Sequence, residues 1–571
     1  MPCSQEEGAA LTNQYAGTTK LAPGSAGPSA SVVEARAGDL RSLAGERWDL
    51  LVVGGGITGC GILLDAATRG LRAALIERDD IAVGTSSRSS RLIHGGLRYL
   101  EQFQIGLVRE ALRERGLLLR LAPHLVRLEP FLFPVYGGPW SRPFFGAGLT
   151  MYDLLGASAD GGFHRHLSVG DALAAAPALR RKGLRGAFVY HDGQEDDARY
   201  AVTVVRTARA KGAIAVTRTE AVHGIEEGGR IVGCTARDVL TGAEFEIRAR
   251  AVVDATGVWT GREDGPFPSS DSHLTQPSRG VHLVVRRDRI QSRYGMTLRI
   301  PHRVCFLVPG PDGWVIGTTD HEDHGSPDRP EPTLAEVDEI LGNVNRTLDV
   351  GLTRNDVVAA FAGLRPLAVD PGGSAGSTVK ASREHRIRTE PSGLVRISGG
   401  KFTTYRLMAA QAVDTALGSV ARSRPSRTAE VQLAGAASKA ELQALAAGIS
   451  AESGIAGGLA DRLVGSFGSD ASAVVTLGRE FGLLGPLGPD IAHIEAEVLW
   501  SVREESALSV DDFLSRRTRL AQEMPDRGAR VAPRVAEIMG SELGWSEAER
   551  AKSVESFLAT AHREYDVPAE A

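Results

Sequence analysis

Residues 89–101, SSRLIHGGLRYLE, place a histidine between two arginines and beside a Gly-Gly pair that would interrupt a helix or a strand. A histidine side chain has an ordinary pKa of roughly 6.5, so His94 can accept a proton from a hydroxyl group near neutral pH. Gly95 and Gly96 have no side chain and would let the backbone pass close to a bound ligand. The segment therefore predicts a proton acceptor on a loop, and other parts of the chain must orient it.

The first of those parts has the pattern of a dinucleotide-binding turn. In residues 48–80, a buried strand meets Gly54, Gly56 and Gly59 in GxGxxG spacing, and an apolar helix leads to a second strand that ends at Glu77. These glycines permit the tight turn, the approach of a pyrophosphate and the close packing of helix on strand. Because Glu77 can accept hydrogen bonds from a ribose diol and would repel a 2′-phosphate, the pattern favours FAD or NAD over NADP.

Two later segments favour FAD. Residues 250–259, RAVVDATGVW, form a buried strand that ends in small residues, which let another backbone segment lie against the same cofactor. Residues 395–417, VRISGGKFTTYRLMAAQAVDTAL, give a strand, two glycines and a helix whose N-terminus could stabilise negative charge on a reduced flavin. Either segment alone could be an ordinary glycine turn, but together they indicate a flavin. The predicted cofactor contacts here are Ala255, Gly257, Gly399, Gly400 and Lys401.

Composition excludes several classes of protein. The 571 residues suffice for two or three domains, and a net charge of −5 without a basic block argues against a nucleic-acid binder. The four cysteines show no CxxC pair and no metal-like spacing with histidine, so we expect no disulfide framework, no metal site and a reducing compartment. We find no apolar run of roughly 18 residues and no secretion signal. Residues 1–45 are predicted to be a flexible tail.

Several longer motifs occur in a characteristic order: TSSRSSRLIHGGLRYLE, VHLVVRRDR, FLVPGPDGWVIGTTD, FAGLRPL, SREH, GGKFTTYR and IAHIEAEVLWSVREESALSVDDFLSRRTRLA. They closely resemble the FAD-dependent glycerol-3-phosphate dehydrogenases, from about residue 46 to about residue 560. The resemblance implies oxidation of sn-glycerol 3-phosphate to dihydroxyacetone phosphate, with electrons passed to a membrane quinone.

The resemblance also implies an α/β fold. We expect a doubly wound, Rossmann-like FAD-binding domain, an inserted substrate domain on a mixed sheet and a C-terminal all-helical domain. The predicted division is 46–125, 180–265 and 360–425 for the FAD-binding domain, 126–179 and 266–359 for the substrate domain, and 430–571 for the helical domain. In the helical part, Ser509 with Asp512 and Ser546 with Glu549 have the spacing of capping boxes, and no residue there carries obvious catalytic chemistry.

The family motifs suggest roles for individual residues. His94 would be the base, Arg365 and Lys401 would lie nearest the reacting alcohol and the flavin, and Arg303 and Arg383 would bind the phosphate. Arg365 is a lone charge in the apolar run FAGLRPL, where it needs a buried partner. The resemblance adds a substrate clamp at Arg98 and Tyr99, and FAD contacts from the serine-rich loop at Thr85, Ser86 and Ser87.

The sequence is compatible with more than one partner and more than one function. Residues 131–155 combine large apolar side chains with Trp140, Arg142 and Tyr152, which suits either a bilayer interface or core packing. Because the family usually passes its electrons to a membrane quinone, the resemblance favours a cytoplasmic protein attached peripherally to the inner face of the cell membrane. No motif specifies a homodimer, although one is compatible with the sequence. The alternatives are a glycerol-3-phosphate oxidase using oxygen, an amine or amino-acid oxidase, and a non-catalytic flavin-binding protein.

Overall fold

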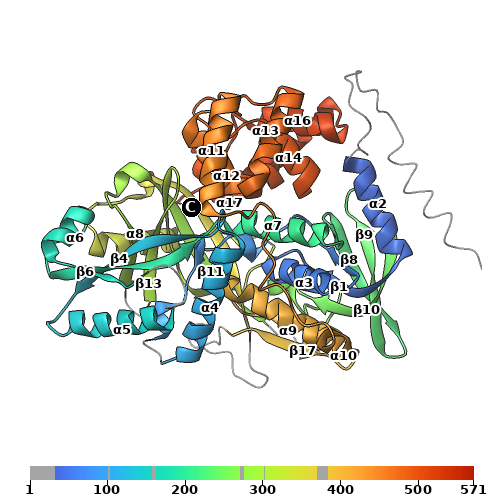
Figure 1. The fold of residues 1–571 in the computed structure, drawn as a ribbon, viewed down its shortest axis with the longest axis horizontal. Helices are drawn as coiled ribbons and strands as arrows, with labels where there is room; N and C mark the ends of the chain where they lie inside the picture. Colours follow the sequence, from blue (N-terminus) through green and yellow to red (C-terminus); the bar gives the residue numbers. More distant parts are fainter. Residues whose placement is uncertain are drawn as a thin grey trace, which may run out of the picture.

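The computed structural model describes residues 32–100, 103–156, 162–269, 275–300, 303–328, 330–368 and 384–570. Two sheets lie side by side, and a group of C-terminal helices, orange to red in Figure 1, sits above them. This is the fold class that the sequence predicts: a doubly wound FAD-binding unit, a mixed-sheet unit and a helical unit.

The first sheet has eight strands within the described residues, in the order β17-β18-β10-β1-β2-β7, with β9 paired to β10 and β8 paired to β9. Its parallel centre explains why the strands are apolar throughout, since helices cover both faces. The strands are β1 (Arg47–Val53), β2 (Ala73–Ile76), β7 (Ile214–Val216), β8 (Thr219–Glu227), β9 (Arg230–Asp238), β10 (Glu244–Asp254), β17 (Arg386–Thr389) and β18 (Val395–Ser398).

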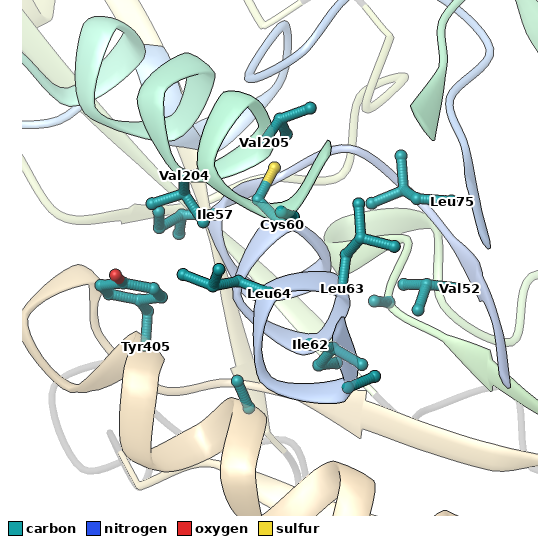
Figure 2. Packing of buried hydrophobic residues seen from close by; sticks show 14 of the residues in the cluster. Val52, Ile57, Cys60, Ile62, Leu63, Leu64, Leu75, Val204, Val205 and Tyr405 are labelled. Carbon is teal, nitrogen blue, oxygen red and sulfur yellow. The ribbon is translucent and has the colours of Figure 1, made fainter. Parts of the chain in front are cut away.

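Helix α3 (Ile57–Thr68) lies at the centre of the core beside this sheet. Its sequence is apolar on every side, as expected of a helix buried all round. Figure 2 shows α3 between α7 (Asp197–Ala210), α9 (Tyr405–Leu417) and the strands that carry Val52 and Leu75. A Cβ on Gly59 would lie 2.0 Å from the carbonyl oxygen of Gly54, and one on Gly61 would lie 2.7 Å from the Tyr405 ring. Only glycine lets the first turn of α3 approach its neighbours this closely.

The second sheet has ten strands among the described residues and is mixed, because β4 runs parallel to β12 while the other pairs are antiparallel. Helices α5 (Ser141–Leu155), α6 (Val169–Ala175) and α8 (Leu334–Thr347) pack against it. The strands are β3 (Leu92–Ile93), β4 (Arg127–Tyr136), β5 (Arg165–Leu167), β6 (Leu184–Gln194), β11 (Thr275–Arg286), β12 (Gly295–Ile300), β13 (Arg303–Pro309), β14 (Gly313–Gly317), β15 (His321–Glu322) and β16 (Val357–Ala368).

The C-terminal part is helical, as predicted. Ser546 and Glu549 form the reciprocal bonds of a capping box. Ser509 and Asp512 also exchange hydrogen bonds, but they begin a π-helical turn rather than an α-helix. The elements are α11 (Lys439–Ser453), α12 (Gly457–Phe467), α13 (Ala471–Phe481), α14 (Ala496–Glu505), the π-turn η8 (Asp512–Arg517), α15 (Leu520–Glu523), α16 (Ala532–Leu543) and α17 (Glu547–Tyr565).

Two features differ from the sequence-based expectation. Residues 32–45 of the predicted flexible tail form helix α2 (Val32–Gly45), because Ala37, Leu40 and Leu43 make one apolar stripe that is buried against the first sheet. Strands β3 and β6 and most of β16 fall in ranges predicted for the FAD-binding domain, yet they pair within the second sheet. A buried apolar strand has the same sequence pattern in either sheet, so the sequence alone could not assign these strands to one sheet or the other. The rest of the proposed division stays a prediction.

The packing of α3 gives a stability test. Gly59→Ala forces a Cβ against the Gly54 carbonyl, and we expect it to lower stability by about 1–3 kcal/mol and to weaken FAD binding. Gly106→Ala in α4 (Ile105–Leu121) is the control, because its Cβ meets nothing within 4 Å. Thermal unfolding followed by circular dichroism measures both variants. Equal unfolding midpoints for the two would contradict the close packing described for α3.

Candidate active site

A cavity of about 540 Å³ opens at the carboxyl ends of β1, β2, β10 and β18. This edge of a doubly wound sheet is where dinucleotides bind. Most of the predicted cofactor contacts line it: Gly54, Gly56, Glu77, Thr85, Ser86, Ala255, Gly257, Gly399, Gly400 and Lys401.

The backbone around this cleft suits a pyrophosphate and a ribose. Gly54 has a φ of +112°, and a Cβ there would lie 2.6 Å from the Ala255 carbonyl oxygen. The N-terminus of α3 has no side-chain cap on its Gly56 N-cap, so it presents backbone N–H groups and positive dipole to the cleft. Ser86 Oγ accepts a hydrogen bond from the N–H of Ile57 at 2.9 Å, which joins the serine-rich loop to this helix end.

Glu77 lines the cleft where β2 ends, at the position predicted to face a ribose. Its carboxylate accepts hydrogen bonds from the N–H groups of Gly55 at 2.6 Å and Asp79 at 2.8 Å. Burial raises the pKa of Glu77 to about 7, although both N–H donors act in the opposite direction. The donor set and the shape of the cleft therefore fit the adenosine half of FAD.

Two predicted cofactor contacts do not face the cleft. Gly59 is buried in the first turn of α3, where it serves helix packing as its motif position implies. Ser87 is also buried, and its hydroxyl donates to the Gly84 carbonyl oxygen at 3.5 Å. Thr85–Ser87 form a short 3-10 turn, in which Thr85 and Ser86 face the cleft while Ser87 turns inward.

A second cavity of about 640 Å³ adjoins the first. Ser89 lines the first cavity and its neighbour Ser90 lines the second. In the same way, Pro366 lines the first cavity and Arg365 lines the second. His94, Tyr99, Arg303 and Arg365 all line the second cavity, so the structure brings these predicted residues together.

The cations are held by specific partners. Arg365 donates to Thr318 Oγ1 at 2.9 Å and lies 3.6 Å from the partly buried carboxylate of Asp320, which supplies a partner for this charge. Gly280 makes room for it, because a Cβ there would lie 2.3 Å from the guanidinium. Lys401 Nζ lies 3.9 Å from the centroid of the Tyr99 ring, which places it beside the second cavity as well as in the first.

Two arginines from neighbouring strands line the wall of the second cavity. Arg303 forms an ion pair with Glu339 at the cavity wall. Arg299, which the sequence analysis did not single out, also lines the cavity, with its guanidinium carbon 5.0 Å from the Phe145 ring centroid. Its position one strand away from Arg303 follows from the β12–β13 register. Arg383 and the side chain of Arg98 lie outside the described residues.

The loop carrying His94 is fixed from behind by a buried polar group. The Gly95 N–H donates to Tyr152 Oη at 2.8 Å, and this hydroxyl donates to Asp192 at 2.8 Å. Arg115 binds the same carboxylate at 2.6 Å and opposes the rise that burial causes in the pKa of Asp192. Tyr152, one of the residues predicted at an interface or in a core, is therefore a core residue with a polar function.

Close packing and a second hydrogen bond complete this loop. A Cβ on Gly95 would lie 2.4 Å from Leu112, and Gly96 has a φ of +78°, so both glycines are required. Ser90 Oγ lies 2.7 Å from His282 Nε2. Burial and the charges of nearby arginines lower the pKa of His282 to about 3, so the ring is uncharged near neutral pH and shares one hydrogen bond with the serine. The lone histidine in the apolar run VHLVV was a signal that the sequence analysis did not use.

Comparison with known proteins identifies the family. Residues 49–406 match the family described as FAD dependent oxidoreductase, and residues 426–550 match the C-terminal domain of alpha-glycerophosphate oxidase. Glycerol-3-phosphate dehydrogenase 2 of Mycobacterium bovis is 42% identical over 92% of this chain and 90% of its own length. The chain belongs to the FAD-dependent glycerol-3-phosphate dehydrogenase family. The mitochondrial glycerol-3-phosphate dehydrogenase of Mesocricetus auratus is 38% identical over 89% of this chain and 72% of its own.

A solved structure supports the same conclusion for the fold and the cofactor. The glycerol-3-phosphate dehydrogenase of Bacillus halodurans, complexed with FAD, superposes with a TM-score of 0.77 at 28% identity, covering 95% of this chain and 99% of that one. Glycine oxidase of Geobacillus kaustophilus superposes with a TM-score of 0.50 at 22% identity over 65% of this chain and 94% of its own, which shows a shared fold alone. FAD is the cofactor of this family member.

Glu77 provides the test of this cofactor site. Glu77→Gln should raise the FAD dissociation constant about 10-fold, a loss of about 1.4 kcal/mol, because an amide replaces the carboxylate that accepts the ribose hydrogen bonds. With a pKa of about 7, the wild-type carboxylate ionises as pH rises, so FAD binding should strengthen from about pH 6 to about pH 8. Fluorescence titration of apoprotein with FAD measures both effects.

The matched control is Glu227→Gln, an exposed carboxylate at the end of β8. It should bind FAD with wild-type affinity and keep the wild-type pH dependence. Glu77 would be removed from the cofactor site if its glutamine variant behaved like this control.

Proposed function

We propose that this protein oxidises sn-glycerol 3-phosphate to dihydroxyacetone phosphate. The observation that carries the proposal is a cavity that adjoins the FAD cleft and combines His94 with the cations Arg299, Arg303 and Arg365. A phosphorylated secondary alcohol needs both kinds of group, a base for its hydroxyl and fixed cations for its phosphate. The names of the relatives that share 42% and 38% identity support the same substrate.

We assign the phosphate to the solvent-facing end of the cavity. Arg299 is exposed there and Arg303 is partly buried, whereas Tyr99 lies inside. Two guanidinium groups from adjacent strands can bind the oxygens of a phosphate dianion with charge-assisted hydrogen bonds. Arg383 and Arg98 stay predicted phosphate and substrate ligands on the strength of their motifs.

This orientation directs the carbinol group toward His94. We propose that His94 accepts the hydroxyl proton, while Arg365 and Lys401 stabilise negative charge as it develops on that oxygen. Bound FAD supplies the acceptor for the hydride that leaves the carbinol carbon. Phe306, whose ring centroid is 6.0 Å from that of His94, joins Leu149 and Phe145 in lining the cavity with apolar surface that limits water.

An anaerobic spectrum tests this function. The FAD-loaded protein should lose its flavin absorption near 450 nm, a rough value for the cofactor class, when sn-glycerol 3-phosphate is added. Glycerol and a D-amino acid should leave the band unchanged. Bleaching by the amino acid alone would favour an amine or amino-acid oxidase, and no bleaching by any of the three would favour a non-catalytic flavoprotein.

The proposed base can be tested separately. His94→Ala should retain FAD but reduce its flavin with sn-glycerol 3-phosphate roughly 100-fold more slowly, because the hydroxyl proton loses its acceptor. His223→Ala is the control, since His223 pairs with Thr235 on an exposed hairpin outside the site. Stopped-flow absorbance measures the rate, and a wild-type rate in His94→Ala would remove this residue from the mechanism.

We further propose a membrane quinone as electron acceptor, reached through an apolar rim. Phe144, Met151, Phe103 and Ile105 line the cavity and are also exposed, with Phe103 86% accessible. Trp140 and Leu154 extend this surface along α5, 81% and 61% accessible. A cluster of large exposed apolar side chains is typical of a bilayer-facing surface. No described helix is both long and apolar enough to cross a membrane. The contact that we propose is peripheral, through this exposed surface and on the inner face of the membrane.

Vesicle binding tests this surface. The double variant Trp140→Ser with Leu154→Ser should co-sediment with anionic lipid vesicles less than the wild type, because it removes apolar area without touching the cavity lining. Val239→Ser with Leu240→Ser is the matched control, since these residues are 44% and 52% accessible at a hairpin tip elsewhere. A wild-type protein that stays wholly in the supernatant would contradict the proposed contact.

A glycerol-3-phosphate oxidase is the second candidate. The match of residues 426–550 to the C-terminal domain of alpha-glycerophosphate oxidase favours it. Hydrogen peroxide formed in equal amount to dihydroxyacetone phosphate in air would support the oxidase, whereas turnover that requires an added quinone would support the dehydrogenase.

A further inference from the structure

The helical group meets the FAD-binding sheet through the motif SRRTRL, residues 515–520, to which the sequence analysis assigned no chemistry. Its arginines, Arg516, Arg517 and Arg519, are only 4%, 3% and 2% accessible. Burying a guanidinium is unfavourable unless it is paired and hydrogen-bonded. The partners of these arginines therefore indicate what the motif does.

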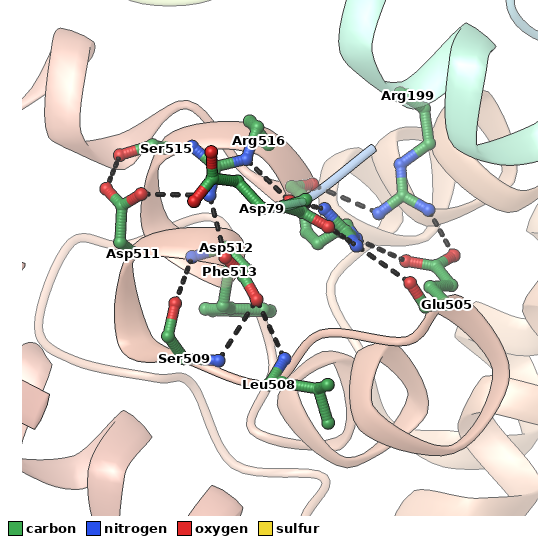
Figure 3. Close-up of polar contacts among 12 residues, drawn as sticks. Asp79, Arg199, Glu505, Leu508, Ser509, Asp511, Asp512, Phe513, Ser515 and Arg516 are labelled. Carbon is green, nitrogen blue, oxygen red and sulfur yellow. Dashed lines mark hydrogen bonds and ion pairs between the residues drawn. The ribbon is translucent and has the colours of Figure 1, made fainter. Parts of the chain in front are cut away.

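Arg516 and Arg517 hold the segment that follows β2. Both bind the carboxylate of Asp80, at 2.5 Å and 2.7 Å, three residues beyond Glu77. Figure 3 shows the turn that presents them: the carboxylate of Asp511 binds Arg516, and Asp512 accepts the N–H of Ser509. The end of η8 is thereby fixed against the ribose side of the FAD cleft.

Arg519 holds the serine-rich loop at two points. Its guanidinium donates to the Ser87 carbonyl oxygen at 3.1 Å. It also binds Asp196 at 2.9 Å and forms an ion pair with the fully buried Asp197. The Asp197 carboxylate in turn accepts the N–H of Ser89 at 3.0 Å, so one side chain fixes both ends of the Ser87–Ser89 turn.

A second contact fixes the loop at Arg91, two residues beyond Ser89. Arg91 donates to the Gln522 side-chain oxygen at 2.6 Å and lies 3.4 Å from Glu523. Arg91 and Arg519 have φ angles of +56° and +74°, a region that non-glycine residues rarely adopt. Such conformations persist where the surrounding contacts determine them, and both residues belong to this one set of contacts.

The position of the loop gives these contacts a role in the reaction. Ser86 binds the N-terminus of α3, Ser89 lines the FAD cleft, Ser90 lines the substrate cavity, and His94 follows after β3. A displacement of Ser87–Arg91 would move the flavin contacts and the base relative to each other. Displacements on the order of 1 Å are sufficient to slow catalysis strongly.

We infer that Arg519, assisted by Gln522, is a positioning residue through which the helical group holds the loop between FAD and His94. The rate of flavin reduction, as a test, rests on the proposed oxidation of sn-glycerol 3-phosphate. The flavin absorption band and the rate of FAD release do not depend on that proposal. A merely structural ion pair would affect stability, whereas a positioning residue also affects the flavin environment and the rate of flavin reduction in protein that remains folded and FAD-loaded.

The experiment compares Arg519→Lys, Arg519→Gln and Gln522→Ala with the control Arg503→Gln. Arg503 makes a two-point ion pair with Glu542, at 2.7 Å and 2.9 Å, inside the helical group and away from the loop. Stopped-flow measurement on FAD-loaded protein gives the limiting rate of flavin reduction and the substrate concentration at half-saturation. The flavin absorption band and the rate of FAD release are recorded for the same samples.

We expect Arg519→Gln to lower the limiting rate about 10-fold or more with little change in half-saturation, to alter the flavin band and to speed FAD release. Arg519→Lys should recover part of the rate, and Arg503→Gln should match the wild type. A wild-type rate, band and release rate in Arg519→Gln would overturn the inference. So would equal rate losses in Arg519→Gln and Arg503→Gln.

Gln522→Ala decides the matter if Arg519→Gln does not fold, because it removes an uncharged group and leaves Asp196 and Asp197 paired. A fall of about three-fold or more in its limiting rate supports the inference, and a wild-type rate overturns it. If the wild-type flavin is not reduced by sn-glycerol 3-phosphate, the proposed function fails instead. In that case the flavin absorption band and the rate of FAD release still test the positioning role. Changes in both support it, and wild-type values overturn it.

Discussion

The segment from Thr85 to Tyr99 has little regular structure, and its conformation depends on hydrogen bonds that other parts of the chain make to it. Tyr152, held by Asp192, binds it beside His94, and Arg519 binds it beside the FAD cleft. These groups are buried, so each would be costly without its partner. The loop and its supports must therefore form together, and the two cavities acquire a common wall as a result.

This dependence gives each unit of the fold a part in one site. The first sheet supplies the glycine turn and Glu77, and the second sheet supplies Arg299, Arg303 and Arg365 around the adjoining cavity. The helical group contributes no side chain to the lining of either cavity among the described residues. Its buried Arg519 nevertheless contacts the loop at Ser87, and Arg516 and Arg517 bind Asp80 just before the loop. Catalytic geometry in such a protein depends on residues far from the substrate as well as on those that touch it.

The sequence singled out many of the residues that line the two cavities. The turn from Gly54 to Glu77 is contiguous, so its spacing could be read directly, and His94 and Arg365 stood out as polar groups in unusual contexts. The residues that hold the loop from outside, Tyr152 and Arg519, could not be predicted in this way. Tyr152 lies 57 residues from Gly95, and Arg519 lies 432 residues from Ser87. Nothing in their local sequences specifies these partners, because the pairing arises only when the sheets and the helical group pack.

A crystal structure of the FAD-loaded protein with dihydroxyacetone phosphate tests the central claim most directly. The account predicts the flavin ring where Ser89–Ser90 meets Arg365–Pro366, with the ligand phosphate at Arg299 and Arg303. The ligand carbonyl oxygen, which occupies the place of the substrate hydroxyl, should lie within hydrogen-bond distance of His94. A phosphate bound beside His94, or a flavin ring outside this junction, would contradict the shared site described here.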